Sequence, residues 1–135
     1  MGYKITDIEG VGPAFADKLA IAEIITTEHL LEMCCTKQGR AKISEATGIG
    51  EGTLLNWANM ADLMRISGIG DQYAELLKET GVDTVKELRT RNADNLAEAM
   101  KKINDERNLT KGEASAKTVA DWIAKANDLD PKITH

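Results

Sequence analysis

The sequence predicts an all-α fold, and three observations support this prediction. Ala, Glu, Lys and Leu, which favour helices, are abundant, while Pro occurs only twice. No stretch shows the alternation of apolar and polar residues that is typical of a half-buried strand. Only 4% of the residues are aromatic, so the core must consist mainly of Leu, Ile, Val and Ala side chains. Such a core suits packed helices.

The first four predicted helices follow from the residues at their ends. Pro13 fits the first turn of a helix, where its missing N–H group costs nothing. Thr26 or its neighbour starts the second helix, and Thr36 starts the third, which Gly48 ends. The fourth starts near Glu51 and carries regularly spaced Leu, Trp and Ala residues. The predicted ranges are about 13–22, 26–35, 36–47 and 51–64.

The second four helices follow in the same way. Gly81 stops the fifth helix, because glycine readily adopts the positive φ that is common after a helix. Thr84 with Glu87 predicts a capping box for the sixth. An Asn or Asp at 92 or 94 starts the seventh, and Ser115 caps the eighth. The predicted ranges are about 71–80, 85–91, 92–104 and 115–128.

One motif occurs twice. The stretch IEGVGPAFADKL, residues 8–19, returns as ISGIGDQYAELL, residues 66–77, 58 positions later. Residues pair at this offset as Gly10 with Gly68, Gly12 with Gly70, Ala16 with Ala74, Leu19 with Leu77, Ile24 with Val82 and Thr26 with Thr84. After an expected polar loop, NDERNLTKGE, the offset becomes 65 and pairs Trp57 with Trp122. We therefore expect two homologous four-helix halves, 1–62 and 63–135, packed as one compact unit because no flexible linker separates them.

The Gly-x-Gly turns are the candidate functional motif. Their glycines allow a tight reversal and let another molecule approach the backbone closely. The residue between the glycines, Val11 or Ile69, can anchor the turn in the core. The free N–H groups at the start of the next helix would then point outward. Together with the helix dipole, they form a small anion site into which a phosphodiester oxygen fits.

The pattern apolar-x-Gly-apolar-Gly-x-x-x-Ala-x-x-Leu resembles the helix-hairpin-helix motif of DNA repair, recombination and replication proteins. The resemblance implies SAM-like repeats whose hairpin amides contact phosphates without reading bases. It assigns phosphate binding to Gly10, Val11, Gly12, Gly68, Ile69 and Gly70, with Lys18 and Arg65 as neighbouring basic residues. Ala16 and Ala74 are the small residues that let the helices approach. A weaker third match contains Gly48, Ile49 and Gly50, with Leu54 at the Ala position.

From about residue 5 to the end, the chain is also similar to a bacterial family of unknown function built from tandem helix-hairpin-helix units. The similarity rests on IEGVGPAFADKL, ATGIG, ADLMRISGIGDQYAELL, GVDTVKELRTRN and DWIAKA, in that order. One position departs from this pattern. Glu23 stands where the second half has Gly81, so the first turn must close without a residue that favours positive φ.

The charges weigh against a broad electrostatic contact with nucleic acid. The net charge is −5. Around the first hairpin Asp7, Glu9, Asp17 and Glu23 oppose Lys18, and around the second Asp62, Asp71, Glu75 and Glu79 oppose Arg65 and Lys78. Hairpins of this type often carry Lys or Arg two residues after the second Gly, where this chain has Ala14 and Gln72. Basic residues gather instead at Lys37, Arg40 and Lys42 and at Lys86, Arg89 and Arg91. These two groups either form a groove beside the hairpins or are solvated helix faces.

Several other residues leave alternatives open. The adjacent Cys34 and Cys35 either form a disulfide or redox pair, or stay reduced with Cys34 in the core. Trp57 and Trp122 are either core residues or platforms for stacking. His29 with a cysteine would be an incomplete metal site, because further ligands at a recognised spacing are missing.

No catalytic motif is present, and acidic pairs such as Asp105 with Glu106 fall in the expected polar loop. We therefore expect a non-enzymatic binding module with no cofactor, no bound metal and no small-molecule substrate. No apolar run is long enough to cross a membrane, and the start MGYKITDIEG lacks the features of a signal peptide, so we expect a cytoplasmic location without membrane contact. The expected function is sequence-independent contact with the backbone of DNA or RNA through the hairpins. The alternative is a protein interaction scaffold that has lost nucleic-acid binding.

Overall fold

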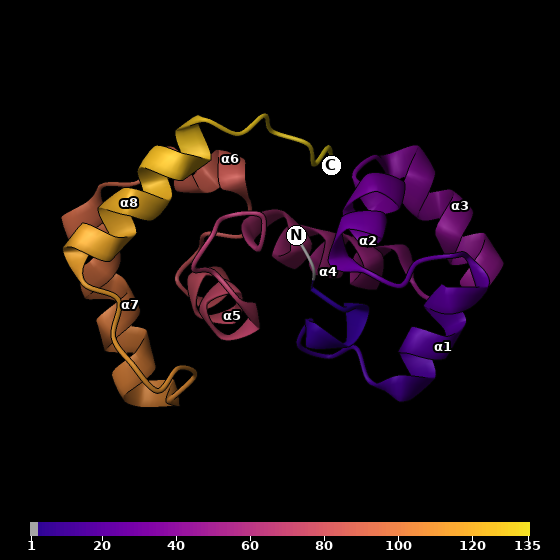
Figure 1. The fold of residues 1–135 in the computed structure, drawn as a ribbon, viewed down its shortest axis with the longest axis horizontal. Helices are drawn as coiled ribbons and strands as arrows, with labels where there is room; N and C mark the ends of the chain where they lie inside the picture. Colours follow the sequence, from indigo (N-terminus) through magenta and orange to yellow (C-terminus); the bar gives the residue numbers. More distant parts are fainter. Residues whose placement is uncertain (1–2) are drawn as a thin grey trace. The chain divides into compact units, whose positions relative to one another are not determined.

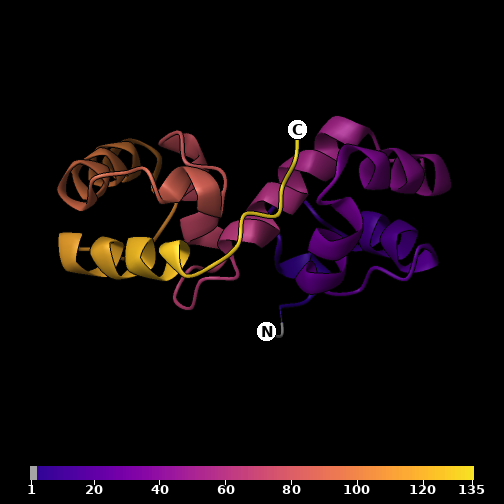
Figure 2. The same ribbon diagram turned by 90° about the horizontal axis from the view of Figure 1, so that it is seen from above.

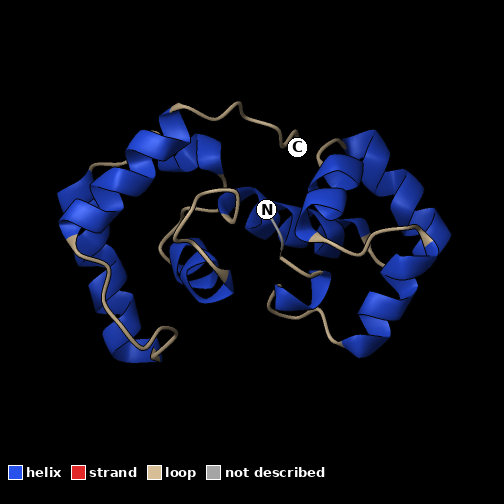
Figure 3. Cartoon of the chain, in the orientation of Figure 1, coloured by secondary structure: helices blue, strands red, loops and turns tan. Residues whose placement is uncertain are grey.

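The structure is a computed structural model that describes residues 3–135. Across these residues the regular elements are helices, apart from one isolated bridge between Lys4 and Thr26 (Figure 3). The all-α prediction is therefore confirmed. A short 3₁₀ helix, Ile5–Asp7, precedes α1 (Pro13–Ile21), α2 (Thr27–Cys34), α3 (Lys37–Thr47), α4 (Glu51–Leu63), α5 (Asp71–Glu79), α6 (Val85–Leu88), α7 (Ala93–Arg107) and α8 (Ala116–Asn127) (Figure 1).

The contacts divide the chain into two compact units. The first unit runs to Asp62 and includes Lys132–His135. The second unit is Leu63–Pro131. The four last residues thus belong to the first unit, whereas the sequence repeat predicts a single boundary between residues 62 and 63.

The first unit is built on α1, α2 and α3. Helix α2 packs on α3, and α1 contacts both α3 and the short 3₁₀ helix. The N-terminal segment is joined to the start of α2, because the Ile5 amide donates to the Ile25 carbonyl at 3.2 Å. The fully buried side chains of this unit include Ile8, Leu19, Ile24, Leu30 and Leu54. They form the aliphatic core that the composition predicts.

The second unit is built on the pair α7 and α8, which lie side by side in two views (Figures 1 and 2). Helix α5 packs on α7, and α6 packs on α8. The fully buried side chains of this unit include Ile69, Leu77, Val82, Leu88 and Val119. As in the first unit, aliphatic side chains make up most of this core.

Most helix boundaries agree with the prediction to within two residues, and two helices differ. Helix α7 extends to Arg107, so Asp105 and Glu106 lie in its last turn and the prediction that they lie in a loop is wrong. Helix α6 ends at Leu88, three residues earlier than predicted. Its predicted capping box is half formed: the Thr84 hydroxyl accepts from the Glu87 amide at 3.2 Å, but the Glu87 carboxylate accepts from Arg91.

Candidate functional site

The two Gly-x-Gly turns have the same backbone geometry. Gly10 adopts φ 94° and Gly68 adopts φ 99°, conformations that suit glycine and strain other residues. The next amide closes each turn in the same way: Val11 donates to the Ile8 carbonyl and Ile69 to the Ile66 carbonyl, both at 3.0 Å. The sequence likeness of the two stretches therefore corresponds to a likeness in local structure.

Each turn is fixed by its middle residue and open at its glycines. Val11 is 4% exposed and Ile69 is fully buried. Gly10 and Gly68 are exposed, and the second glycine of each turn is partly exposed. The apolar residue therefore anchors the turn in the core, as the sequence predicts, while the glycine backbone reaches the surface.

The helices that follow the hairpins begin without a side-chain cap. Gly12 is the N-cap of α1 and Gly70 is the N-cap of α5. The first helical bond of each runs to the N-cap carbonyl, at 2.9 Å from Ala16 and from Ala74. The amides before that bond have no acceptor inside the helix. In five other helices a side-chain oxygen accepts from the third amide, and these caps are Thr26, Thr36, Thr84, Asn92 and Ser115.

A buried tryptophan lies beneath each hairpin. A Cβ added to Gly10 would lie 3.5 Å from Nε1 of Trp57, and one added to Gly68 would lie 3.0 Å from Nε1 of Trp122. The two indoles are 3% and 2% exposed. The core alternative for the tryptophans is thus confirmed, and the stacking-platform alternative is wrong because a nucleobase cannot reach a buried ring.

Each indole also contacts an aromatic ring from the helix after the hairpin. The centroids of Phe15 and Trp57 are 5.1 Å apart with an interplanar angle of 72°, and those of Tyr73 and Trp122 are 5.2 Å apart at 62°. Both pairs have the edge-to-face geometry that aromatic rings prefer. Hairpin, indole and first-turn ring therefore recur as one local arrangement in both units.

The two hairpins differ in charge at the helix start. The first turn of α1 contains Pro13 and Ala14 and no acidic residue. The first turn of α5 begins with Asp71. A carboxylate there supplies its own negative charge to the helix N-terminus. The start of α1 therefore lacks the negative charge that the start of α5 carries.

The two basic residues assigned to the site lie at different kinds of position. Lys18 is exposed on α1, and its Nζ atom is 5.7 Å from the centroid of the Phe15 ring. Arg65 is half-buried and donates to the Asp130 carbonyl at 2.9 Å. Lys18 therefore presents its ammonium group to solvent in the second turn after its hairpin, whereas a backbone carbonyl holds the guanidinium of Arg65.

The first basic group consists of Lys37, Arg40 and Lys42. The prediction that it forms either a solvated face or a groove is wrong for Arg40, which is buried. The Arg40 side chain is 3% exposed and donates to the carbonyls of Cys34, at 3.0 Å, and Thr134, at 2.6 Å. Its guanidinium therefore bonds carbonyls inside the first unit and does not face solvent. The neighbouring Lys37 and Lys42 are exposed, as a solvated face requires.

In the second basic group, Arg91 donates to the Glu87 carboxylate at 2.9 Å and to the Gly81 carbonyl at 3.2 Å. Its charge is therefore partly neutralised within the second unit. Lys86 is exposed and Arg89 is half-buried. The group therefore presents less free positive charge than the sequence suggests.

The third glycine match has part of the same geometry. Gly48 adopts φ 77°, Ile49 is 3% exposed, and the Leu54 amide donates to the Gly50 carbonyl at 3.0 Å. Leu54 itself is fully buried. This turn therefore also combines a glycine at positive φ with an apolar anchor and a helix start.

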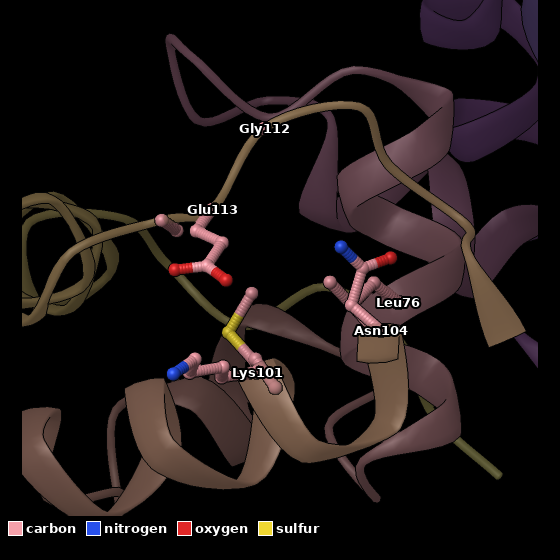
Figure 4. Close-up of a pocket in the computed structure, with 7 residues that line it drawn as sticks. Leu76, Lys101, Asn104, Gly112 and Glu113 are labelled. Atoms are coloured by element: carbon pink, nitrogen blue, oxygen red, sulfur yellow. The ribbon is translucent and has the colours of Figure 1, made fainter. Parts of the chain in front are cut away.

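A small pocket lies between α5, α7 and the loop after α7. Figure 4 shows Leu76, Lys101, Asn104, Gly112 and Glu113 around it. Its volume is about 10 Å³, which is the space of one water molecule. This pocket therefore suits a structural water and excludes a small organic ligand.

The candidate redox and metal residues, Cys34, Cys35 and His29, each have their own surroundings at α2 and its C-cap. Cys34 is fully buried and Cys35 is half-buried, and both thiols are free. The Nδ1 atom of His29 accepts from the Ile25 amide at 3.4 Å. Throughout residues 3–135, no three His, Cys, Asp or Glu side chains are placed to hold a metal ion together.

The first unit exposes several large apolar side chains, a feature that was not predicted from the sequence. Ile21, Ile25 and Met33 are 78%, 57% and 40% exposed, respectively. A signal for them was present, because the residues 58 positions later are Glu79, Asp83 and Arg91, which are all charged.

Comparison with known proteins identifies a family model that covers most of the chain. The model of a protein family described as Domain of unknown function (DUF4332) matches residues 9–129. The expected membership of a family of unknown function is therefore confirmed. No curated protein and no solved structure matches the chain. None of the helices in the described part of the chain has both the length and the apolar character needed to cross a membrane.

Proposed function

The chain belongs to the DUF4332 family. We propose that it is a non-enzymatic module that contacts the backbone of DNA or RNA without reading sequence. The contacts come from the amides where the Gly10–Gly12 and Gly68–Gly70 hairpins lead into α1 and α5. The Val11 and Ile69 amides do not take part, because they donate to the Ile8 and Ile66 carbonyls. The two units are tandem helix-hairpin-helix repeats in this proposal. Their matching φ angles, turn bonds, indoles and first-turn rings support it.

One observation carries the proposal: the helices after the hairpins begin at an open glycine turn with no side-chain cap, whereas five other helices have one. An uncapped N-terminus leaves N–H groups that need an acceptor from water or a ligand. A phosphate oxygen is a suitable acceptor, because it also interacts favourably with the helix dipole. Since phosphates are the same in every nucleotide, such contacts do not discriminate between sequences.

The first hairpin contributes most in this proposal. It has no acidic residue in the first helical turn and has Lys18 in the next. The second hairpin has Asp71 at the helix start, where a carboxylate repels a phosphate. Binding is therefore weak, since the net charge of −5 opposes it. Added salt weakens it further, because salt ions compete for the contacted phosphates.

The test is the binding of a fluorescent mixed-sequence duplex, and of a single strand, at low and at moderate salt. Gly12→Asp places a carboxylate at the uncapped α1 terminus, and an added Cβ meets nothing within 4 Å, so the fold tolerates the change. We expect about a fivefold loss of affinity, since a charge at a helix terminus contributes on the order of 1 kcal/mol. Gly70→Asp should have a smaller effect because Asp71 already lies there.

Ala99→Asp is the control. It also adds one negative charge, at an exposed position in the middle of α7 and outside the Gly-x-Gly turns and the helix starts that follow them. It should reduce affinity only slightly, through net charge. No binding at low salt, or equal binding by the Gly12 and Ala99 variants, contradicts the proposal.

The second candidate function is a protein interaction scaffold. It is favoured by Phe15, Ile21, Ile25 and Met33, the exposed large apolar side chains of the described chain. A partner that remains bound after nuclease treatment would support it. Recovery of nucleic acid alone would count against it.

A further inference from the structure

Three of the exposed apolar side chains follow one another along the first unit. Ile21 is the last residue of α1, Ile25 lies just before the Thr26 cap of α2, and Met33 lies near the end of α2. His29 and Met33 are four residues apart within α2, so they lie on the same side of this helix. The Nδ1 atom of His29 accepts from the Ile25 amide at 3.4 Å, so the Ile25 backbone lies beside this side of α2.

The second unit shows that this local fold does not need an apolar surface here. The residues 58 positions later are Glu79, Asp83 and Arg91. Glu79 pairs with Arg107, and Arg91 pairs with Glu87. Charged side chains with partners of this kind are typical of a surface that faces water. The exposed Ile21, Ile25 and Met33 are therefore a property of the first unit alone.

Two acidic residues lie beside these apolar side chains. Glu23 is exposed in the turn between Ile21 and Ile25, and Glu32 is exposed next to Met33. Glu23 adopts φ 65°, a conformation that disfavours residues other than glycine, and the second unit has Gly81 at this position. A strained residue at an exposed position suggests a role for its side chain outside folding. A carboxylate in the middle of an apolar surface can pair with a cation of a partner.

We propose that the face formed by Ile21, Glu23, Ile25, Glu32 and Met33 binds a basic amphipathic helix of another protein. The apolar side chains of that helix cover Ile21, Ile25 and Met33, and its flanking Lys or Arg side chains pair with Glu23 and Glu32. Exposed apolar patches with polar rims are typical of protein interaction sites. Opposite charges at the rim set the choice of partner more than the affinity.

Charge also excludes other occupants of this face, which we call the Ile21–Met33 face. In a two-fold contact between copies of this chain, the same surface patch meets itself, so the acids at its rim face like charges. Nucleic acid and anionic lipid surfaces are repelled by the same two acids. The proposal is independent of the hairpins, which lie on other residues.

The test uses the full chain and a fluorescent helical peptide of about 16 residues, with Leu along one face and Lys and Arg beside it. The paired variant Ile25→Asp with Met33→Arg introduces the residues of the second unit. It should weaken binding at least tenfold, because the peptide loses two apolar contacts and meets two charged side chains in their place. Ala120→Asp with Ala124→Arg is the matched control: it introduces the same two charged residues at exposed positions of α8, outside the face, and should leave affinity unchanged.

A second pair of substitutions tests the two acidic residues of the Ile21–Met33 face. Glu23→Lys with Glu32→Lys should weaken binding of the basic peptide and improve binding of a peptide with Glu in place of its Lys and Arg. Circular dichroism should show the same helix content in every variant. Sedimentation should show a monomer. The proposal is overturned if neither peptide binds, if the acidic peptide binds the unchanged protein better, if the paired variant binds as well as the unchanged protein, or if sedimentation shows a dimer that the paired variant abolishes.

Discussion

A Cβ atom on Gly68 would lie 3.0 Å from Nε1 of Trp122, closer than side-chain contacts normally allow. The corresponding distance from Gly10 to Nε1 of Trp57 is 3.5 Å, an ordinary contact. Both glycines adopt positive φ. The hairpin of the second unit therefore needs glycine for two reasons, conformation and space, whereas that of the first needs it for conformation alone.

We predict that Gly68→Ala destabilises the protein more than Gly10→Ala. Each change places a side chain at positive φ, which costs about 1–2 kcal/mol. Gly68→Ala should cost about 1 kcal/mol more, because the buried Trp122 indole has to move. The free energies of unfolding in urea measure the difference, and the tryptophan fluorescence of the folded state should change for Gly68→Ala only. Equal losses would show that the packing of Trp122 adjusts without cost.

Gly12→Ala is the control for both. Gly12 adopts φ −87°, and an added Cβ meets nothing within 4 Å. The change should alter the free energy of unfolding by less than about 0.5 kcal/mol, as surface substitutions usually do. A loss as large as that of Gly10→Ala would mean that the positive φ of Gly10 is not what the turn requires.

Glu23→Gly should stabilise the protein by about 1 kcal/mol. Glu23 adopts φ 65° on the surface, and glycine adopts that conformation without the clash between Cβ and the backbone. Denaturation in urea measures the gain. If the Ile21–Met33 face binds a basic helix, the stabilised variant should also bind it more weakly, which would link the strain to binding.

Asn108→Gly is the matched control for Glu23→Gly. Asn108 ends α7 at φ 56°, but Asn tolerates positive φ better than Glu. Its replacement should therefore give a smaller gain in the free energy of unfolding. An equal gain at both positions would mean that the strain at Glu23 is no larger than that at an ordinary helix end.

Local sequence signals predicted the helix starts well, because capping depends on residues close together in the chain. Thr26, Thr36 and Ser115 accept from the third amide of their helices as predicted. The end of α7 was predicted too early because its last turn is polar. The polar side chains of this turn do not interrupt the backbone hydrogen bonds of the helix. The Asn104 side chain instead accepts a hydrogen bond from the Thr110 amide at 2.9 Å and so holds the following loop.

The state of the candidate basic residues could not be predicted, because their partners are distant in sequence. Arg40 resembles a solvent-facing residue in a helix of polar composition. Its side chain is buried because it donates to the carbonyl of Thr134, 94 positions away. Contacts of this separation have no local signal. The hairpins were predictable for the opposite reason, since each turn is closed within a few residues.

Cys34 should be inert to alkylation at neutral pH, whereas Cys35 should react. Burial raises the pKa of the Cys34 thiol from 9.0 to about 11, although the Arg40 guanidinium acts in the opposite direction. The neutral thiol is favoured in the folded state, so the free energy of unfolding should be unaffected below pH 9 and fall as the pH rises from about 9 to about 11. Mass spectrometry after brief treatment with iodoacetamide at pH 7 should find label on Cys35 alone. Cys34→Ala should remove the part of the alkaline loss that this thiol causes.

The contact between Arg40 and Thr134 should couple residues 132–135 to the stability of the first unit. The guanidinium is buried, and one of its donors loses its acceptor if these residues are removed. An unsatisfied buried donor costs about 1–3 kcal/mol. Removing residues 132–135 should lower the free energy of unfolding by about this amount. Thr134→Pro should cost less, because it removes the bonds from the Thr134 amide and hydroxyl to the Cys35 carbonyl but keeps the carbonyl that accepts from Arg40. Arg40→Met separates the role of the charge from that of packing, since Met fills similar space without hydrogen-bond donors.

In the Arg40→Met background the same truncation should cost at least 1 kcal/mol less, because the free-energy changes caused by removing two hydrogen-bonded partners do not add. Equal costs of truncation in the two backgrounds would show that the segment stabilises the unit through contacts other than this hydrogen bond.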